Sequence, residues 1–149
     1  MGNDKIIDVD VSVTRNKRFR IDGDDDRIIE LNTSDMTILN RINDADKKLR
    51  ELADYATFDV EDTAENQEEA ITKLINTDKQ MREIIDYLFN SKVADICAPN
   101  GSMYDPFNGK YRFEHILETL FALYEKNIND EYKKMKKNVE KHTNKYIGK

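Results

Sequence analysis

The sequence predicts an α+β fold in which a short N-terminal antiparallel β-hairpin or sheet packs on a bundle of three long helices. Before residue 32, apolar and polar side chains alternate on both sides of a glycine-containing turn, as in strands with one buried face. Between Asp35 and Val139, apolar residues recur every three or four positions in three long stretches, which is the pattern of amphipathic helices. The 149 residues are expected to form a single domain, 1–149.

Strand patterns fill residues 1–31, the predicted β-hairpin region. The first pattern predicts a strand with one buried face, because apolar residues alternate with polar ones at Ile7, Val9, Val11 and Val13. The second predicts a hairpin, because apolar residues lie before and after a turn, at Phe19, Ile21, Ile28, Ile29 and Leu31.

The turn of this hairpin is acidic, because Asp22, Asp24 and Asp26 alternate in it. This is the spacing of the first ligands in an EF-hand loop. Arg27 stands where that loop requires glycine, however, and Thr33 stands where it requires glutamate. A solvated hairpin turn is therefore the preferred interpretation, and no metal is expected here.

Three helices are predicted after the hairpin, over residues 33–57, 64–97 and 111–141. The first follows Asn32–Asp35, whose side chains can accept the free amides of a helix start. The second has the apolar spacing of a heptad seam interrupted by Asp78, which favours ordinary helix packing over a polar residue that sets the register. Residues 142–149 are expected to form a frayed basic tail.

The apolar faces of these elements predict most of the hydrophobic core. Its expected members are Ile21, Ile29, Leu39, Ile42, Leu49, Leu74, Met81, Ile85, Leu88, Leu117, Leu120 and Phe121.

Two regions are candidates for contact with a partner protein. The glycine- and proline-rich loop over residues 98–109 and its flank carry large apolar side chains, which either cap the core or anchor a partner. The third helix continues as a thin, lysine-flanked apolar line, which can meet another subunit or protein. The candidate protein-binding residues are Met103, Tyr104, Phe107, Tyr111, Tyr132, Met135 and Val139.

The net charge of −6 is unevenly distributed along the chain. Residues 126–149 hold eight lysines against three acidic residues and carry +5, which leaves −11 for residues 1–125. Lysines complement the carboxyl end of a helix dipole, and this interpretation is preferred to nucleic-acid binding. The basic end has no arginine, and the acidic remainder would repel a duplex, so nucleic acid is not an expected partner.

The sequence contains no pattern typical of an enzyme. It has no phosphate-binding glycine loop and no nucleophile elbow. His115 and Glu118 supply at most two of the ligands that a zinc site needs. The single cysteine, Cys97, is expected to be a buried small side chain in a reducing compartment. We therefore expect a protein that is not an enzyme, with no catalytic residue, no cofactor and no metal.

Membrane and export signals are also missing from the sequence. The first ten residues lack a signal-peptide pattern, and no apolar run approaches the ~20 residues that span a bilayer. A soluble, cytoplasmic protein with no membrane contact is expected.

The runs Phe19–Asp35 and Pro106–Tyr111 resemble small proteins encoded in tail modules of phages and prophages of low-GC Gram-positive bacteria. Some of these are similar to tail assembly chaperones. The resemblance implies binding of the helical tape-measure protein, in the cytoplasm of an infected or lysogenic host, by a protein that can act as a homo-oligomer. It brings no catalytic residue with it.

An alternative function belongs to another class of proteins. The charge of −11 on residues 1–125 is compatible with a phage-encoded inhibitor that binds a host enzyme or defence protein. Such an inhibitor would imitate nucleic acid with carboxylates spaced along one continuous face.

Overall fold

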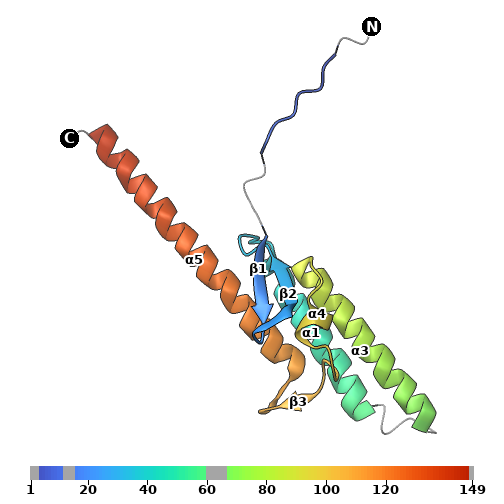
Figure 1. Ribbon diagram of the computed structural model, residues 1–149. Helices are drawn as coiled ribbons and strands as arrows, with labels where there is room; N and C mark the ends of the chain where they lie inside the picture. Colours follow the sequence, from blue (N-terminus) through green and yellow to red (C-terminus); the bar gives the residue numbers. More distant parts are fainter. Residues whose placement is uncertain (1–3, 12–15, 60–66, 148–149) are drawn as a thin grey trace.

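The computed structural model describes residues 4–11, 16–59 and 67–147 and confirms the α+β class. A two-stranded antiparallel sheet precedes three long helices (Figure 1). In chain order the elements are β1 (Lys17–Ile21), β2 (Asp24–Leu31), α1 (Ile38–Asp54), the π-helical turn η1 (Tyr55–Asp59), α3 (Gln67–Phe89), α4 (Ala94–Cys97), β3 (Pro106–Phe107), β4 (Lys110–Tyr111) and α5 (Arg112–Ile147).

The hairpin predicted around the acidic turn is confirmed. Strands β1 and β2 pair antiparallel, with Phe19 opposite Ile29. Asp22 and Gly23 both have positive φ angles, of 54° and 71°, as tight two-residue hairpin turns require. The aspartates of the turn therefore serve the hairpin, and the Oδ1 atom of Asp24 accepts the backbone amide of Asp26 at 2.9 Å.

The earlier strand, predicted from the alternation that begins at Ile7, is wrong for the residues that the structure describes. Residues 4–11 form no strand, and Ile7, Val9 and Val11 are between 74% and 80% exposed. Figure 1 shows this segment leading away from the body of the protein. A strand needs a neighbour for its backbone hydrogen bonds, and none lies beside this segment among the described residues. Val13 lies outside the described residues.

Helix α1 begins at Ile38, later than the predicted start at residue 33. The Asp35 carboxylate accepts the backbone amide of Thr37 at 2.9 Å and the Thr37 hydroxyl at 2.5 Å. These bonds hold residues 35–37 in a turn before the helix. Asp35 therefore stabilises the turn that precedes α1, whereas the sequence predicted that it would accept a free amide of the first helical turn.

The helix predicted over 64–97 is divided into two in the structure. Helix α3 ends at Phe89, and the next residue, Asn90, has a positive φ angle of 50°. The Oδ1 atom of Asp86 then accepts the backbone amides of Val93 and Ala94, both at 2.8 Å, which begins the short helix α4 in a new direction. Residues 64–66 of the prediction lie outside the described residues.

Helix α5 is longer than predicted. It runs from Arg112 to Ile147, so residues 142–147, which were expected to fray, continue the helix. Figure 1 shows its second half extending away from the hairpin and from α1 and α3, which lie side by side.

The core lies between the hairpin, α1, α3 and the first half of α5. Most of its predicted members are buried or partly buried and packed against the core, but Leu39 is 40% exposed and was assigned wrongly. Leu74 is only partly buried. The loop after α4 and the first turn of α5 also contribute to the core, because Met103 and Phe113 are fully buried in it.

Candidate interaction surface

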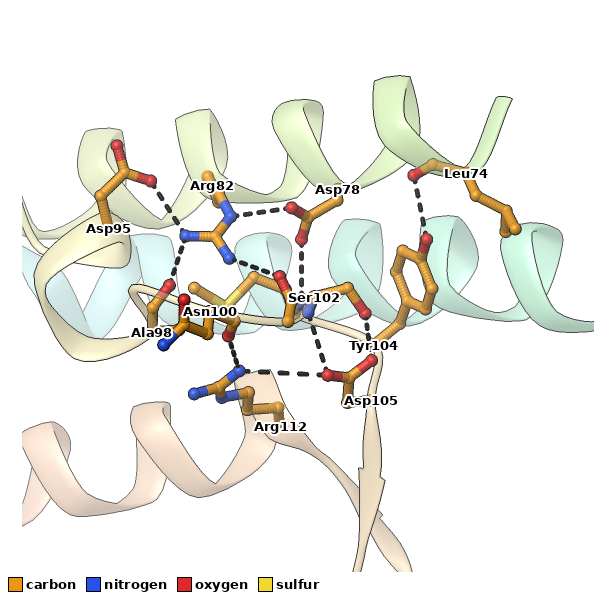
Figure 2. Close-up of polar contacts among 12 residues, drawn as sticks. Leu74, Asp78, Arg82, Asp95, Ala98, Asn100, Ser102, Tyr104, Asp105 and Arg112 are labelled. Atoms are coloured by element: carbon orange, nitrogen blue, oxygen red, sulfur yellow. Dashed lines mark hydrogen bonds and ion pairs between the residues drawn. The ribbon is translucent and has the colours of Figure 1, made fainter. Parts of the chain in front are cut away.

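The loop predicted over residues 98–109 is fixed to α3 by one ion pair. Asp78 and Arg82 lie one turn apart on α3, with 2.8 Å between Asp78 Oδ2 and Arg82 Nε. The Oδ1 atom of Asp78 accepts the backbone amide of Met103 at 2.7 Å, and Arg82 donates to the carbonyl oxygens of Ala98 and Gly101 (Figure 2). The polar residue that interrupts the apolar seam of α3 therefore anchors this loop.

A second group of contacts closes the loop against the start of α5. The Asp105 carboxylate accepts the backbone amide and the hydroxyl of Ser102, and it lies 4.0 Å from Arg112 (Figure 2). Burial alone would raise the pKa of Asp105. The hydrogen bonds from Ser102 and the charge of Arg112 outweigh burial and hold this pKa below its ordinary value.

These contacts decide the positions of the predicted binding residues of the loop region. Met103 is completely buried in the core, which leaves it no surface for a partner. Tyr104 is half-buried, and its hydroxyl donates to the Leu74 carbonyl oxygen at 3.0 Å. The Tyr111 hydroxyl donates to Asp54 at 3.0 Å, and its ring stacks on Phe113. The loop region thus mainly caps the core.

Phe107 is the exception among these residues, because it is 64% exposed. Its ring packs edge-on against His115 with 5.5 Å between the ring centroids, and His115 Nε2 lies 2.8 Å from the Phe107 carbonyl oxygen. Figure 1 shows β3, which contains Phe107, near the beginning of α5. Phe107 is therefore separated from the exposed second half of that helix.

Helix α5 leaves the body of the protein at Asn127. The amide group of Asn127 donates to Ser34 Oγ at 3.1 Å, and its oxygen accepts Lys17 Nζ of β1 at 2.6 Å. One turn later, the Tyr132 hydroxyl lies 3.5 Å from the Met36 sulfur. A small hollow of about 80 Å³ separates the segment before α1 from α5 here. Beyond this point, residues 133–140 are all exposed.

Three of the predicted binding residues lie together on this projecting part of α5. Tyr132, Met135 and Val139 follow one another at intervals of three and four, so they share one face of the helix. They are 49%, 57% and 64% exposed, and we call them the α5 stripe. Met36, which is 44% exposed, extends the stripe onto the body. Sequence reasoning missed Met36, because no periodicity links the segment before α1 to a distant helix.

Lysines are frequent on this part of α5. Lys133, Lys134, Lys136 and Lys137 are all exposed, and Lys134 lies 3.4 Å from Glu131 one turn earlier. The stretch that carries the stripe is therefore net basic, with four lysines and two glutamates over residues 131–140. An acidic amphipathic helix has the complementary properties.

The larger hollows of the surface carry little reactive chemistry. One of about 650 Å³ is lined by Cys97 and His115, among other residues. Burial raises the pKa of Cys97 to about 11, so the thiol is protonated at neutral pH. No hydrogen bond joins it to His115 in the part of the chain that the structure describes. The other hollow, of about 550 Å³ between α1 and α3, is lined mainly by charged and amide side chains.

Across residues 4–11, 16–59 and 67–147, no group of three or more histidine, cysteine or acidic side chains could hold a metal ion. Within the same ranges, no helix has both the length and the apolar character needed to cross a membrane. Comparisons with protein-family models, with curated proteins and with solved structures found no match to this chain.

Proposed function

We propose that the protein is a non-enzymatic protein-binding module that holds a helical partner on the α5 stripe. The observation that carries the proposal is the exposure of Tyr132, Met135 and Val139 on a helix that continues past the body of the protein. An apolar line on a projecting helix is most stable when a second apolar face covers it.

The partner is an amphipathic helix with acidic flanks. Its apolar residues, also spaced by three and four, would pack between the side chains of the α5 stripe, as knobs do in a two-helix seam. Its carboxylates would lie near Lys136, the lysine next to the stripe. Those charges would set orientation and speed association, while the apolar contacts would supply most of the affinity.

The sequence resemblance narrows this partner to the tape-measure protein of a phage tail. A tape-measure protein is long and largely helical, so its apolar stripes are exposed to aggregation before the tail tube encloses them. A chaperone with one short stripe per molecule would bind each site weakly. Several molecules bound along the same chain, or joined in an oligomer, would gain strength from multivalency.

Many acidic residues form ion pairs with arginines. These ion pairs weigh against the alternative function, in which the protein inhibits a host protein by imitating nucleic acid. Asp22, Asp35, Asp46, Asp78 and Glu114 each lie within 4 Å of an arginine nitrogen. Carboxylates that are neutralised in this way do not form the continuous unpaired row that imitation of a phosphate backbone requires.

Co-expression with a tape-measure fragment tests the proposal. The intact protein should co-purify with the fragment and increase the soluble amount of it. Val139→Asp or Met135→Asp should lower this binding at least tenfold, because each places a charge in the apolar seam. Lys137→Asp is the matched control: it introduces the same residue on the opposite side of α5 and should retain most of the binding.

Two results would overturn the proposal. One is an unchanged amount of soluble fragment with no co-purification by the intact protein. The other is equal binding by Val139→Asp and the intact protein, which would show that the α5 stripe is not the contact surface. Circular dichroism of each variant verifies that the fold is retained, and it should be, because residue 139 is exposed.

A further inference from the structure

The N-terminal segment and the sheet have matching, uncovered surfaces. Residues 7–11 alternate apolar with polar side chains, and Ile7, Val9 and Val11 are at least 74% exposed. Ile6, just before them, is 95% exposed and would share a strand face with Asp8 and Asp10. This is the residue pattern of a β-strand, but in the described structure no strand lies beside the segment. Exposure of three β-branched apolar side chains on one face is unfavourable, so pairing that covers them would lower the free energy of the segment.

Strand β1 supplies a free edge. In the described part of the chain, this sheet has two strands, in the order β1–β2. Helix α4 lies beside β2, where Arg27 donates to the carbonyl oxygens of Ile96 and Cys97. Among the described residues no strand lies on the other side of β1, so the backbone groups on that side can accept an added strand.

The two faces of β1 match the two faces of the segment. On one face, Phe19 and Ile21 are partly buried and pack against the core. On the opposite face, Arg18 and Arg20 are 72% and 58% exposed, and they lie 4.0 and 2.9 Å from Glu30 and Asp25 of β2. Their exposure leaves them accessible to further acids from an added strand. A strand placed beside β1 with Val9 and Val11 on the core face would place Asp8 and Asp10 beside the two arginines. A slip by one residue would exchange these faces and lose both matches.

The arginines also make this edge selective. Charged side chains on an edge strand oppose pairing with most other strands. Arg18 and Arg20 would reject a basic or purely apolar strand and accept one that carries acids at alternate positions. The segment around Asp8 and Asp10 is a strand of this kind.

We propose that two copies of the protein form a dimer by strand exchange, in which residues 4–11 of each copy add to the β1 edge of the other. Figure 1 shows the segment leading away from its own sheet, which places it for a neighbouring molecule. Reciprocal exchange closes a twofold dimer and leaves both segments covered. The dimer is independent of the α5 stripe and would present two such stripes to a partner.

Charge exchange tests this dimer in the full-length protein. The first variant is Asp8→Lys/Asp10→Lys, and the second is Arg18→Glu/Arg20→Glu. Alone, each variant would place like charges side by side, and its dimer dissociation constant should rise at least tenfold. In an equimolar mixture, a heterodimer has two strand pairings. In one, the lysines of the first variant lie beside the glutamates of the second. In the other, the original aspartates of the second variant lie beside the original arginines of the first. The mixture should therefore form a heterodimer with a dissociation constant within about threefold of the original.

Light scattering after size-exclusion chromatography gives the masses over a range of concentrations. Asp130→Lys/Glu140→Lys is the control for Asp8→Lys/Asp10→Lys, because it makes the same change of net charge on α5 and should leave the dimer intact. Val139→Asp should also leave it intact, which separates this dimer from binding on the α5 stripe.

Three results would overturn the strand exchange. The intact protein could be a monomer at every concentration. The two variants could remain dimers on their own. They could also stay monomeric when mixed, which would be the outcome if the segment paired with β1 of its own molecule. The mixture also controls for folding, because an Arg18→Glu/Arg20→Glu hairpin that was unfolded could not be rescued by the other variant.

Discussion

The carboxylate of Asp78 accepts the backbone amide of Met103 at 2.7 Å, across 25 residues of sequence. The other carboxylate oxygen of Asp78 accepts Arg82 Nε, and Arg82 in turn donates to two carbonyl oxygens of the same loop. Through Asp78 and Arg82, the middle of α3 holds the loop that inserts Met103 into the core. The polar residue in the apolar seam of α3 thus holds a distant loop in place.

Replacing Asp78 should destabilise the protein. Asp78→Ala leaves the Met103 amide without its acceptor and Arg82 without its nearest acid, and both groups are largely shielded from water. We expect a loss of roughly 2 kcal/mol in the free energy of unfolding, measured by urea titration. Asp78→Asn keeps an acceptor oxygen and should lose less. Equal stability of Asp78→Ala and the original protein would show that this contact does not hold the loop.

Leu120→Asp should unfold the protein. Leu120 is 3% exposed and lies on the packed half of α5, so the substitution places an unpaired charge in the core, at a cost of about 4 kcal/mol or more. Thermal melting followed by circular dichroism measures the effect. Thr119→Asp, at the neighbouring exposed position, should leave the melting temperature almost unchanged. A soluble Leu120→Asp protein with unchanged melting would show that the buried face of α5 is a different one.

Acid should remove the stability that Asp35 contributes. Burial alone would raise the pKa of Asp35, but hydrogen bonds from Thr37 and Arg41 outweigh it and lower the pKa below its ordinary value of 3.8. A carboxyl whose pKa falls on folding stabilises the protein above its unfolded pKa and loses this contribution as the pH falls through the folded pKa. Urea titrations at pH 7 and pH 3 should therefore show a smaller difference for Asp35→Asn than for the original protein.

Residual pH dependence is expected in Asp35→Asn, because hydrogen bonds and cations also lower the pKa values of Asp105 and Glu118. The comparison between the two proteins isolates the part due to Asp35. An identical change in unfolding free energy from pH 7 to pH 3 in both would contradict the assignment.

Cys97 should react slowly with thiol reagents in the folded protein. Burial raises its pKa from 9.0 to about 11, so the thiolate fraction at pH 8 falls on the order of a hundredfold. The rate of reaction with a disulfide reagent, followed by absorbance, should be lower by at least this factor than in protein unfolded by urea. The folded rate should also continue to rise above pH 9. A folded rate as fast as the unfolded one would contradict the burial of this thiol.

The sequence by itself determined the class of fold and most of the helix faces. The hairpin around Gly23 and the buried positions Leu49, Met81, Ile85 and Leu120 follow from local turn chemistry and from apolar periodicity. The α5 stripe could also be found in this way, because Tyr132, Met135 and Val139 are regularly spaced on one helix. Each of these features depends on residues close together in the chain.

Tertiary structure alone decided where each apolar group finds its neighbours. The sequence of residues 4–11 has the pattern of a strand, but a strand exists only beside another, and the hairpin does not pair with this segment. Asp78 and Arg82 bind the backbone of the loop at Met103 and Gly101. The side chain of Met103 is therefore buried in the core, whereas Phe107, further along the chain, is exposed. Leu39 lies on a helix face that was expected to be covered, and it is 40% exposed among the described residues. Periodicity shows that a side chain is apolar and which way it faces, whereas burial also requires another part of the chain to pack against it.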